Sequence, residues 1–297
     1  MTTQSEVSTY NEMIRDVLEK LQLPYFIMKD VNCFSKWIYG GFLRWIVSYI
    51  EENDSCPNMY SVEEYLIKSD MDIRIRPYKN QGCDAIIAIY NKVKEMGGYI
   101  EFVGNEYKNH YELNQYKDLK MCKTENEKSY IYYGNYFIWI PSQTQQGAFM
   151  RYDISYFNEA GCQYTKDFSV NMLEYGLIKG LTARQIDKVL TDIKARTISF
   201  VITDAKKIYR CKKLIDRGYT LTEKSVKELY EKIKTILKEW EWDDFHIYEN
   251  ISEPSIKNPT EGVIHITKHK PLIFNKKSFE QSYIVQYIIE KYDTCCL

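Results

Sequence analysis

One stretch restricts the fold of this chain more than any other: in Asp70-Met-Asp-Ile-Arg-Ile-Arg76, polar and apolar residues alternate. Alternation with a period of two is typical of a β-strand that buries one face and leaves the other accessible. The apolar residues would face a core, while Asp70, Asp72 and Arg74 would share the opposite face. The sequence therefore predicts a half-buried strand that presents two carboxylates on one side.

Periodic patterns in the rest of the chain predict an α+β fold. Apolar residues at helical spacing indicate helices at residues 9–22, 43–50, 84–95, 182–193, 204–217, 223–240 and 279–292. Runs of β-branched and aromatic residues indicate strands at residues 71–76, 99–103, 130–140, 149–157 and 262–267. Mixed elements give way to mainly helical ones between residues 165 and 180. We therefore predict a small mixed-sheet domain over residues 1–175, followed by a mainly helical domain over residues 176–297.

The composition is that of an ordinary globular protein and excludes several classes. Of the 297 residues, 44% are apolar and 27% are charged. No apolar run reaches the roughly 18 residues that cross a bilayer, and residues 1–10 lack the features of a signal peptide. The eight cysteines form no Cys-x-x-Cys pair and are expected to be reduced thiols. We therefore expect a cytoplasmic protein without a membrane partner.

The charge balance restricts how the chain would contact nucleic acid. The net charge is −1, which excludes a globally basic nucleic-acid-binding protein. Contact with RNA would then depend on local patches, and the basic residues within 206–213 and 268–277 are the candidates. For each patch, a solvated face of a helix or loop is the alternative interpretation.

The acidic residues of the predicted strand suggest metal chemistry. Residues i and i+2 of a strand lie on one face, roughly 6.5–7 Å apart, which is the spacing of Asp70 and Asp72. Carboxylate oxygens are the ligands that Mg²⁺ prefers, and pairs of Mg²⁺ ions about 4 Å apart serve reactions at phosphate. Asp153, in another strand-like run, is the candidate for a third ligand, within about 10 Å of Asp72. The alternative for Asp70 and Asp72 is a pair of solvated surface aspartates.

A glycine pair stands upstream of these acids. Gly40 and Gly41 precede a predicted helix, and Arg44 follows within its first turn. Glycines at the start of a helix let backbone N–H groups approach a phosphate, and the helix N-terminus favours the anion. The alternative interpretation is a plain tight turn.

Several segments, taken in order, resemble a known family. Gly40-Gly-Phe-Leu-Arg44 followed by Asp70-Met-Asp-Ile is similar to the signature of polymerase-β-like nucleotidyltransferases. Lys166-Asp-Phe-Ser-Val-Asn-Met-Leu173 resembles a segment of tRNA CCA-adding enzymes and bacterial poly(A) polymerases. Asp204-Ala-Lys-Lys-Ile-Tyr-Arg-Cys-Lys-Lys213 and then Gly218-Tyr-Thr-Leu221 resemble the helix that follows in that family and its continuation. The resemblance covers roughly residues 25–235.

The resemblance implies a nucleotidyltransferase that adds nucleotides from NTP to an RNA 3′ end, with two Mg²⁺ ions and Mn²⁺ as a substitute. It implies the following roles: Asp70 and Asp72 as metal ligands, Gly40, Gly41 and Arg44 at the triphosphate, Asp167 and Asn171 near the sugar, and Lys207 and Arg210 near the incoming base. Asp153, assigned above from the strand pattern, would complete the catalytic carboxylates.

The chain departs from the family pattern at several positions. The stretch between Gly41 and Asp70 is longer than usual, so an inserted helix or loop is expected. The family's base-reading Glu-Asp-x-x-Arg appears here as Thr203-Asp-Ala-Lys-Lys207. Lysine has no planar fork to read a base edge, so we expect no strict C-C-A order. Two alternatives stay open: an inactive relative that binds RNA or serves as a scaffold, and nucleotidyl transfer to a protein or small molecule.

Overall fold

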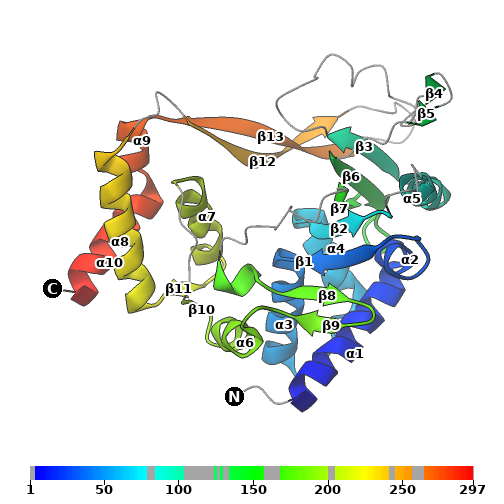
Figure 1. The fold of residues 1–297 in the computed structure, drawn as a ribbon, viewed down its shortest axis with the longest axis horizontal. Helices are drawn as coiled ribbons and strands as arrows, with labels where there is room; N and C mark the ends of the chain where they lie inside the picture. Colours follow the sequence, from blue (N-terminus) through cyan, green and yellow to red (C-terminus); the bar gives the residue numbers. More distant parts are fainter. Residues whose placement is uncertain are drawn as a thin grey trace. The chain divides into compact units, whose positions relative to one another are not determined.

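The computed structural model describes residues 4–78, 84–103, 124–125, 128–129, 134–156, 168–199, 205–240, 245–255 and 264–296 (Figure 1). The chain divides into two compact units. The first comprises residues 1–164 and 173–184, and the second comprises residues 165–172 and 185–297.

The first unit contains a sheet of seven described strands in the order β3-β6-β7-β2-β1-β8-β9. These strands are β1 (Ser35–Tyr39), β2 (Met71–Arg76), β3 (Tyr99–Val103), β6 (Gly134–Pro141), β7 (Phe149–Tyr156), β8 (Glu174–Gly176) and β9 (Gly180–Thr182). The central pair, β2 and β7, is parallel, and the other neighbours in the sheet are antiparallel. A short separate pair joins β4 (Thr124–Glu125) to β5 (Lys128–Ser129).

Five helices in the described part of the first unit pack against this sheet (Figure 1). They are α1 (Gln4–Leu21), α2 (Leu23–Lys29), α3 (Gly41–Asn53), α4 (Met59–Lys68) and α5 (Asp84–Glu95). Burial alternates along β2: Met71, Ile73 and Ile75 are fully buried, whereas Asp72 and Arg74 are partly accessible. One face of the sheet is therefore apolar and belongs to the core, and the other carries polar side chains.

The second unit combines helices with a long hairpin. Its elements are η2 (Ser169–Asn171), α6 (Ile186–Lys194), β10 (Thr197–Ile198), α7 (Ala205–Ile215), β11 (Thr220–Leu221), α8 (Glu223–Lys238), β12 (Phe245–Ser255), β13 (Ile264–Phe274), α9 (Lys276–Glu280) and α10 (Tyr283–Cys296). Helix α10 packs against α7 and α8, and the rings of Tyr230 and Tyr292 stack with centroids 3.8 Å apart. Strands β12 and β13 pair antiparallel along their whole length.

The structure confirms the predicted α+β class. The strand predicted at residues 71–76 is β2, and the helix predicted at residues 84–95 is α5. The first predicted helix, at residues 9–22, ends just before Pro24, since α1 ends at Leu21. Pro24 lies in the first turn of α2, where proline needs no N–H donor. Helix α4 lies within the lengthened stretch between Gly41 and Asp70. Within the described parts of the chain, no helix is long and apolar enough to cross a membrane.

Candidate functional site

The polar face of the sheet brings the predicted acidic residues together. Strands β2 and β7 run parallel, with Asp72 directly beside Asp153 in the register. Side chains at paired positions share a face, and neighbouring strands lie about 4.8 Å apart. On the other side of Asp72 in the register is Tyr39 of β1, and on the other side of Asp153 is Phe137 of β6. The register thus sets the acids in the middle of the sheet.

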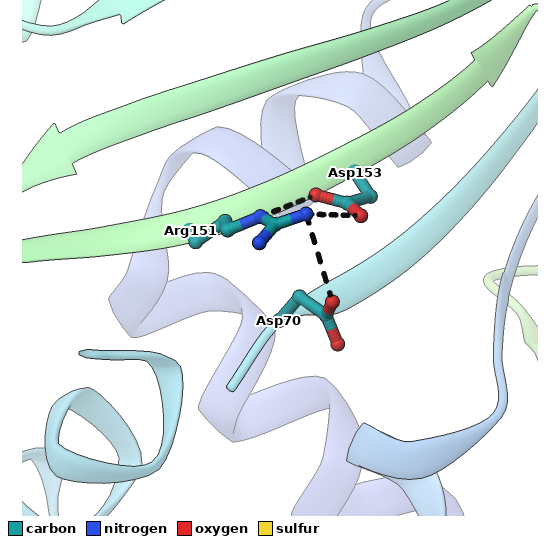
Figure 2. Close-up of polar contacts among 3 residues, drawn as sticks. All are labelled: Asp70, Arg151 and Asp153. Carbon is teal, nitrogen blue, oxygen red and sulfur yellow. Dashed lines mark hydrogen bonds and ion pairs between the residues drawn. The ribbon is translucent and has the colours of Figure 1, made fainter. Parts of the chain in front are cut away.

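Arg151 lies between two of these carboxylates, as Figure 2 shows. Its Nε and Nη2 atoms donate to the two oxygens of Asp153, each at 2.9 Å, and its Nη2 atom lies 4.0 Å from Oδ2 of Asp70. The guanidinium is 4.5 Å from the ring centroid of Phe137, and the Arg151 side chain is only 5% exposed. A buried bidentate pair of this kind fixes both geometry and charge. Arg151 therefore sets the orientation of Asp153.

Burial and charge both act on Asp153. Removal from solvent is the largest cause that raises its pKa, and the nearby charge of Asp70 adds to it, while Arg151 opposes both. The net result raises the pKa of Asp153 from its ordinary value of 3.8 to about 7. Burial and the charge of Asp70 thus favour the neutral form of the Asp153 carboxyl, and a cation bound beside it would lower its pKa again.

This shift predicts how stability depends on pH. Because the folded-state pKa of Asp153 is raised, the folded protein binds more protons than the unfolded chain between about pH 4 and pH 7. The contribution of Asp153 to the free energy of unfolding is fully present below about pH 4 and is lost as the pH rises to about 7. We expect the stability of the wild type relative to Asp153→Asn to fall as the pH rises through the window. Urea unfolding in a chelator at a series of pH values measures this, and a difference that stays constant would contradict it.

The glycine pair lies against the same acids. Gly40 precedes α3 with φ 78° and ψ −135°, a region that residues other than glycine rarely adopt. A Cβ atom on Gly40 would lie 3.2 Å from Oδ2 of Asp72. The N–H of Gly40 donates to the carbonyl of Leu173 at 3.2 Å. The Asp72 carboxylate thus lies directly at the start of helix α3.

Arg44 folds back toward this turn. Its Nη2 atom lies 3.6 Å from the position of a Cβ on Gly41, and the hydroxyl of Tyr65 lies 3.2 Å from that position. The Arg44 side chain is buried. A helix N-terminus and a neighbouring guanidinium both favour an anion. The turn therefore combines a site suited to phosphate with carboxylates suited to a cation.

A second buried carboxylate holds the loop that leads into β7. Glu63 of α4 accepts hydrogen bonds at Oε2 from the hydroxyl of Ser142, from the N–H groups of Gln143 and Thr144, and from the hydroxyl of Thr144. Glu63 is 1% exposed, so this single oxygen satisfies donors that would otherwise lie unpaired. The contact anchors the N-terminal end of the strand that carries Arg151 and Asp153.

We expect Glu63→Ala to lower the free energy of unfolding by about 3 kcal/mol, because buried donors lose their acceptor. Glu63→Gln keeps an acceptor oxygen and should cost about 1 kcal/mol. Urea unfolding measures both. Glu64→Ala is the control: its carboxylate is 43% exposed and pairs with Lys68, a contact worth only about 0.5 kcal/mol. Equal losses for Glu63→Ala and Glu64→Ala would show that the loop contact is dispensable.

Asp70, Asp72 and Asp153 have the donor atoms that a metal site needs, but they are not grouped as a complete set of ligands. Among the described residues, no three histidine, cysteine, aspartate or glutamate side chains are grouped as ligands for a metal ion. Asp153 presents its oxygens to Arg151, so its role as a third ligand stays a prediction. Asp70 and Asp72 fit Mg²⁺ in donor chemistry, since this ion is commonly held by one or two carboxylates and completed by substrate phosphates and water.

The remaining predicted site residues lie elsewhere in the chain. Asp167 is outside the described residues. Asn171 lies in η2, and Lys207 and Arg210 lie in α7, all within the second unit. The Arg210 side chain is exposed, while the Lys207 side chain is outside the described part. The structure therefore brings together the six predicted residues of the first unit, namely Gly40, Gly41, Arg44, Asp70, Asp72 and Asp153.

Comparison with known proteins adds no assignment, since neither the protein-family models nor the curated protein sequences contain a match to this chain. Sequence reasoning missed two residues of the site. Arg151 stands at i−2 from Asp153, which places both on one face of a strand, and this spacing is a signal that points to their pairing. Glu63 has no comparable signal, because its partners are about 80 residues away.

Proposed function

We propose that this chain is a metal-dependent nucleotidyltransferase that adds nucleotides from NTP to an RNA 3′ end, in the cytoplasm. The observation that carries the proposal is the juxtaposition on the sheet face: Asp72 lies beside Asp153 and also against the glycine turn that opens α3. Such a face suits a nucleoside triphosphate, whose phosphates need N–H donors and whose metal needs carboxylates. The resemblance to CCA-adding enzymes and poly(A) polymerases supports RNA as the acceptor.

In this proposal each residue has a defined task. The N–H groups at the start of α3 and the Arg44 guanidinium orient the triphosphate. Asp70 and Asp72 would hold Mg²⁺, which when bound supplies positive charge against the pyrophosphate leaving group. Asp153, oriented by Arg151, lies beside Asp72, where it would accept the proton of the attacking hydroxyl or join the metal ligands.

We propose that the protein discriminates only weakly among the bases of the four NTPs. The residues that correspond to the family's base-reading helix are in α7, where Lys207 replaces an arginine. A lysine donates without a fixed angle, and loss of a bidentate contact removes about 1–3 kcal/mol of discrimination. The four NTPs should therefore react with kcat/KM values within about a hundredfold of one another.

The test is extension of a short labelled RNA with each NTP separately, in Mg²⁺ or Mn²⁺. We expect products longer than the primer, resolved on a denaturing gel. A preference for CTP above about a thousandfold would show that another residue reads the base. Absence of extension by a folded protein with all four NTPs would contradict the proposed function.

A second candidate function, an inactive RNA-binding or scaffold protein, is favoured by one observation. Both oxygens of Asp153 are engaged by Arg151, as in a structural ion pair. This candidate predicts RNA binding without extension, whereas transfer to a protein or small molecule predicts label from NTP in products other than the RNA. The extension assay, repeated with labelled NTP and accompanied by an RNA-binding measurement, separates the three outcomes.

A further inference from the structure

The charge of the side chains on the polar face of the sheet changes from negative to positive along β2. From its beginning to its end, the side chains on this face are Asp70, Asp72, Arg74 and Arg76. Arg74 is engaged: its Nη2 atom lies 3.1 Å from Glu174 and its guanidinium lies 5.7 Å from the Tyr39 ring centroid. Arg76 is about 13 Å further along the strand than Asp72. The acids thus lie at one end of a strand whose other end is basic.

Two exposed aromatic rings lie at this basic end. Phe34, just before β1, is 60% exposed, and Tyr78, just after β2, is 44% exposed. Their rings meet edge to face, with centroids 6.0 Å apart. The Arg76 guanidinium lies 4.7 Å from the centroid of the Phe34 ring. A cation is thus held against a ring that retains much of its contact with solvent.

A second cation–ring pair joins Trp37 of β1 to Lys179 in the turn between β8 and β9. The ammonium of Lys179 is 5.5 Å from the Trp37 ring centroid. The indole of Trp37 lies against the backbone of Gly176 in β8, since a Cβ there would be 3.2 Å from its Cζ3 atom. Trp37 and Arg74 are partners in the β1–β2 register. We name Phe34, Trp37, Arg76, Tyr78 and Lys179 the aromatic–cationic patch.

We propose that the aromatic–cationic patch binds single-stranded RNA. Exposed rings stack on bases of any sequence, and cations beside them contact the phosphates, which is how single strands are bound without base reading. The net charge of the chain is −1, so attraction to phosphate depends on such local groups. That the bound strand is the acceptor of the acid site rests on the proposed function, and the observation behind it is that β2 carries both Asp72 and Arg76.

The test is fluorescence anisotropy with a short labelled single-stranded RNA, in chelator and without NTP. We expect Phe34→Ala and Arg76→Gln each to raise Kd about tenfold. Arg76→Gln should also lower the salt dependence of log K by about 0.7. Phe34→Tyr keeps a ring and should bind as the wild type does. Tyr60→Ala and Lys68→Gln are the matched controls, since these residues of α4 are 55% and 71% exposed, and they should not change Kd.

Because the assay contains neither metal nor NTP, its outcome is separate from that of the extension assay. Asp72→Asn should bind RNA as the wild type does even where it transfers nothing. Unchanged Kd for folded Phe34→Ala and Arg76→Gln would overturn the proposal. So would a dimer in sedimentation that Phe34→Ala converts to monomer without any loss of RNA binding, because the patch would then be a protein interface.

Discussion

Asp72→Asn is expected to lower the rate of nucleotidyl transfer about 1,000-fold, because a metal ligand supplies several kcal/mol of transition-state stabilisation. Asp72 is the carboxylate that lies beside Asp153 in the register and against the glycine turn. The loss should appear in kcat of primer extension. Removal of one negative charge from the acid cluster should leave the fold intact and raise the melting temperature.

Asp54→Asn is the matched control for this substitution. Asp54 is exposed and ends α3 in a left-handed conformation that asparagine also adopts. This variant should transfer at the wild-type rate. Wild-type activity in Asp72→Asn would show that Asp72 is not a metal ligand, and the proposed site would then be wrong.

Gly40→Ala is the second substitution with a large expected effect. The backbone at Gly40 has φ 78°, which costs an alanine about 2 kcal/mol. The added Cβ would also lie 3.2 Å from Oδ2 of Asp72 and press on this carboxylate. Since a misplacement of about 1 Å can cost about a hundredfold in rate, we expect loss of both stability and transfer. Thermal unfolding and primer extension measure the two effects.

Gly147→Ala separates backbone strain from the contact with Asp72. Gly147 has φ 76°, and a Cβ there would meet nothing within 4 Å. It should therefore lose a similar amount of stability as Gly40→Ala but keep its activity. Equal transfer rates for the two variants would mean that the approach of Gly40 to Asp72 has no catalytic role.

The sequence predicted the elements whose pattern is strongly periodic. The alternation from Asp70 to Arg76 identified β2, and the helical spacing at residues 84–95 identified α5. The aromatic run at residues 149–157 identified β7. Each of these elements has one apolar face and one polar face, so the period alone shows which side is buried. The same alternation placed Asp70 and Asp72 on the accessible face.

Shorter or less regular elements were missed. Strand β1 (Ser35–Tyr39) does not alternate polar and apolar residues, and strands β8 and β9 have only three residues each, which is too few for a period to be recognised. Strand β13 is longer than the run predicted at residues 262–267, and its partner β12 was not predicted. Pairing between distant strands depends on tertiary contacts, and the pattern of a single strand does not contain them.

The interactions within the candidate site were harder to predict than its residues. The sequence identified Asp153 as a neighbour of Asp72, but not that Arg151 would hold both of its oxygens. It also did not show that Gly40 approaches Asp72, because that contact joins β1 to β2 through their register. Charges that compete for one carboxylate can be ranked only when distances and burial are known.

Nucleotidyl transfer is tested most directly by following the α-phosphate and the γ-phosphate of ATP separately. The protein is incubated with Mg²⁺, a short RNA and ATP labelled either at the α-phosphate or at the γ-phosphate. The proposed transfer predicts that α-label enters the RNA, that γ-label is released as pyrophosphate, and that Asp72→Asn does neither. Transfer of γ-label to any acceptor, or a rate unchanged in Asp72→Asn, would contradict nucleotidyl transfer at the acid cluster of β2 and β7.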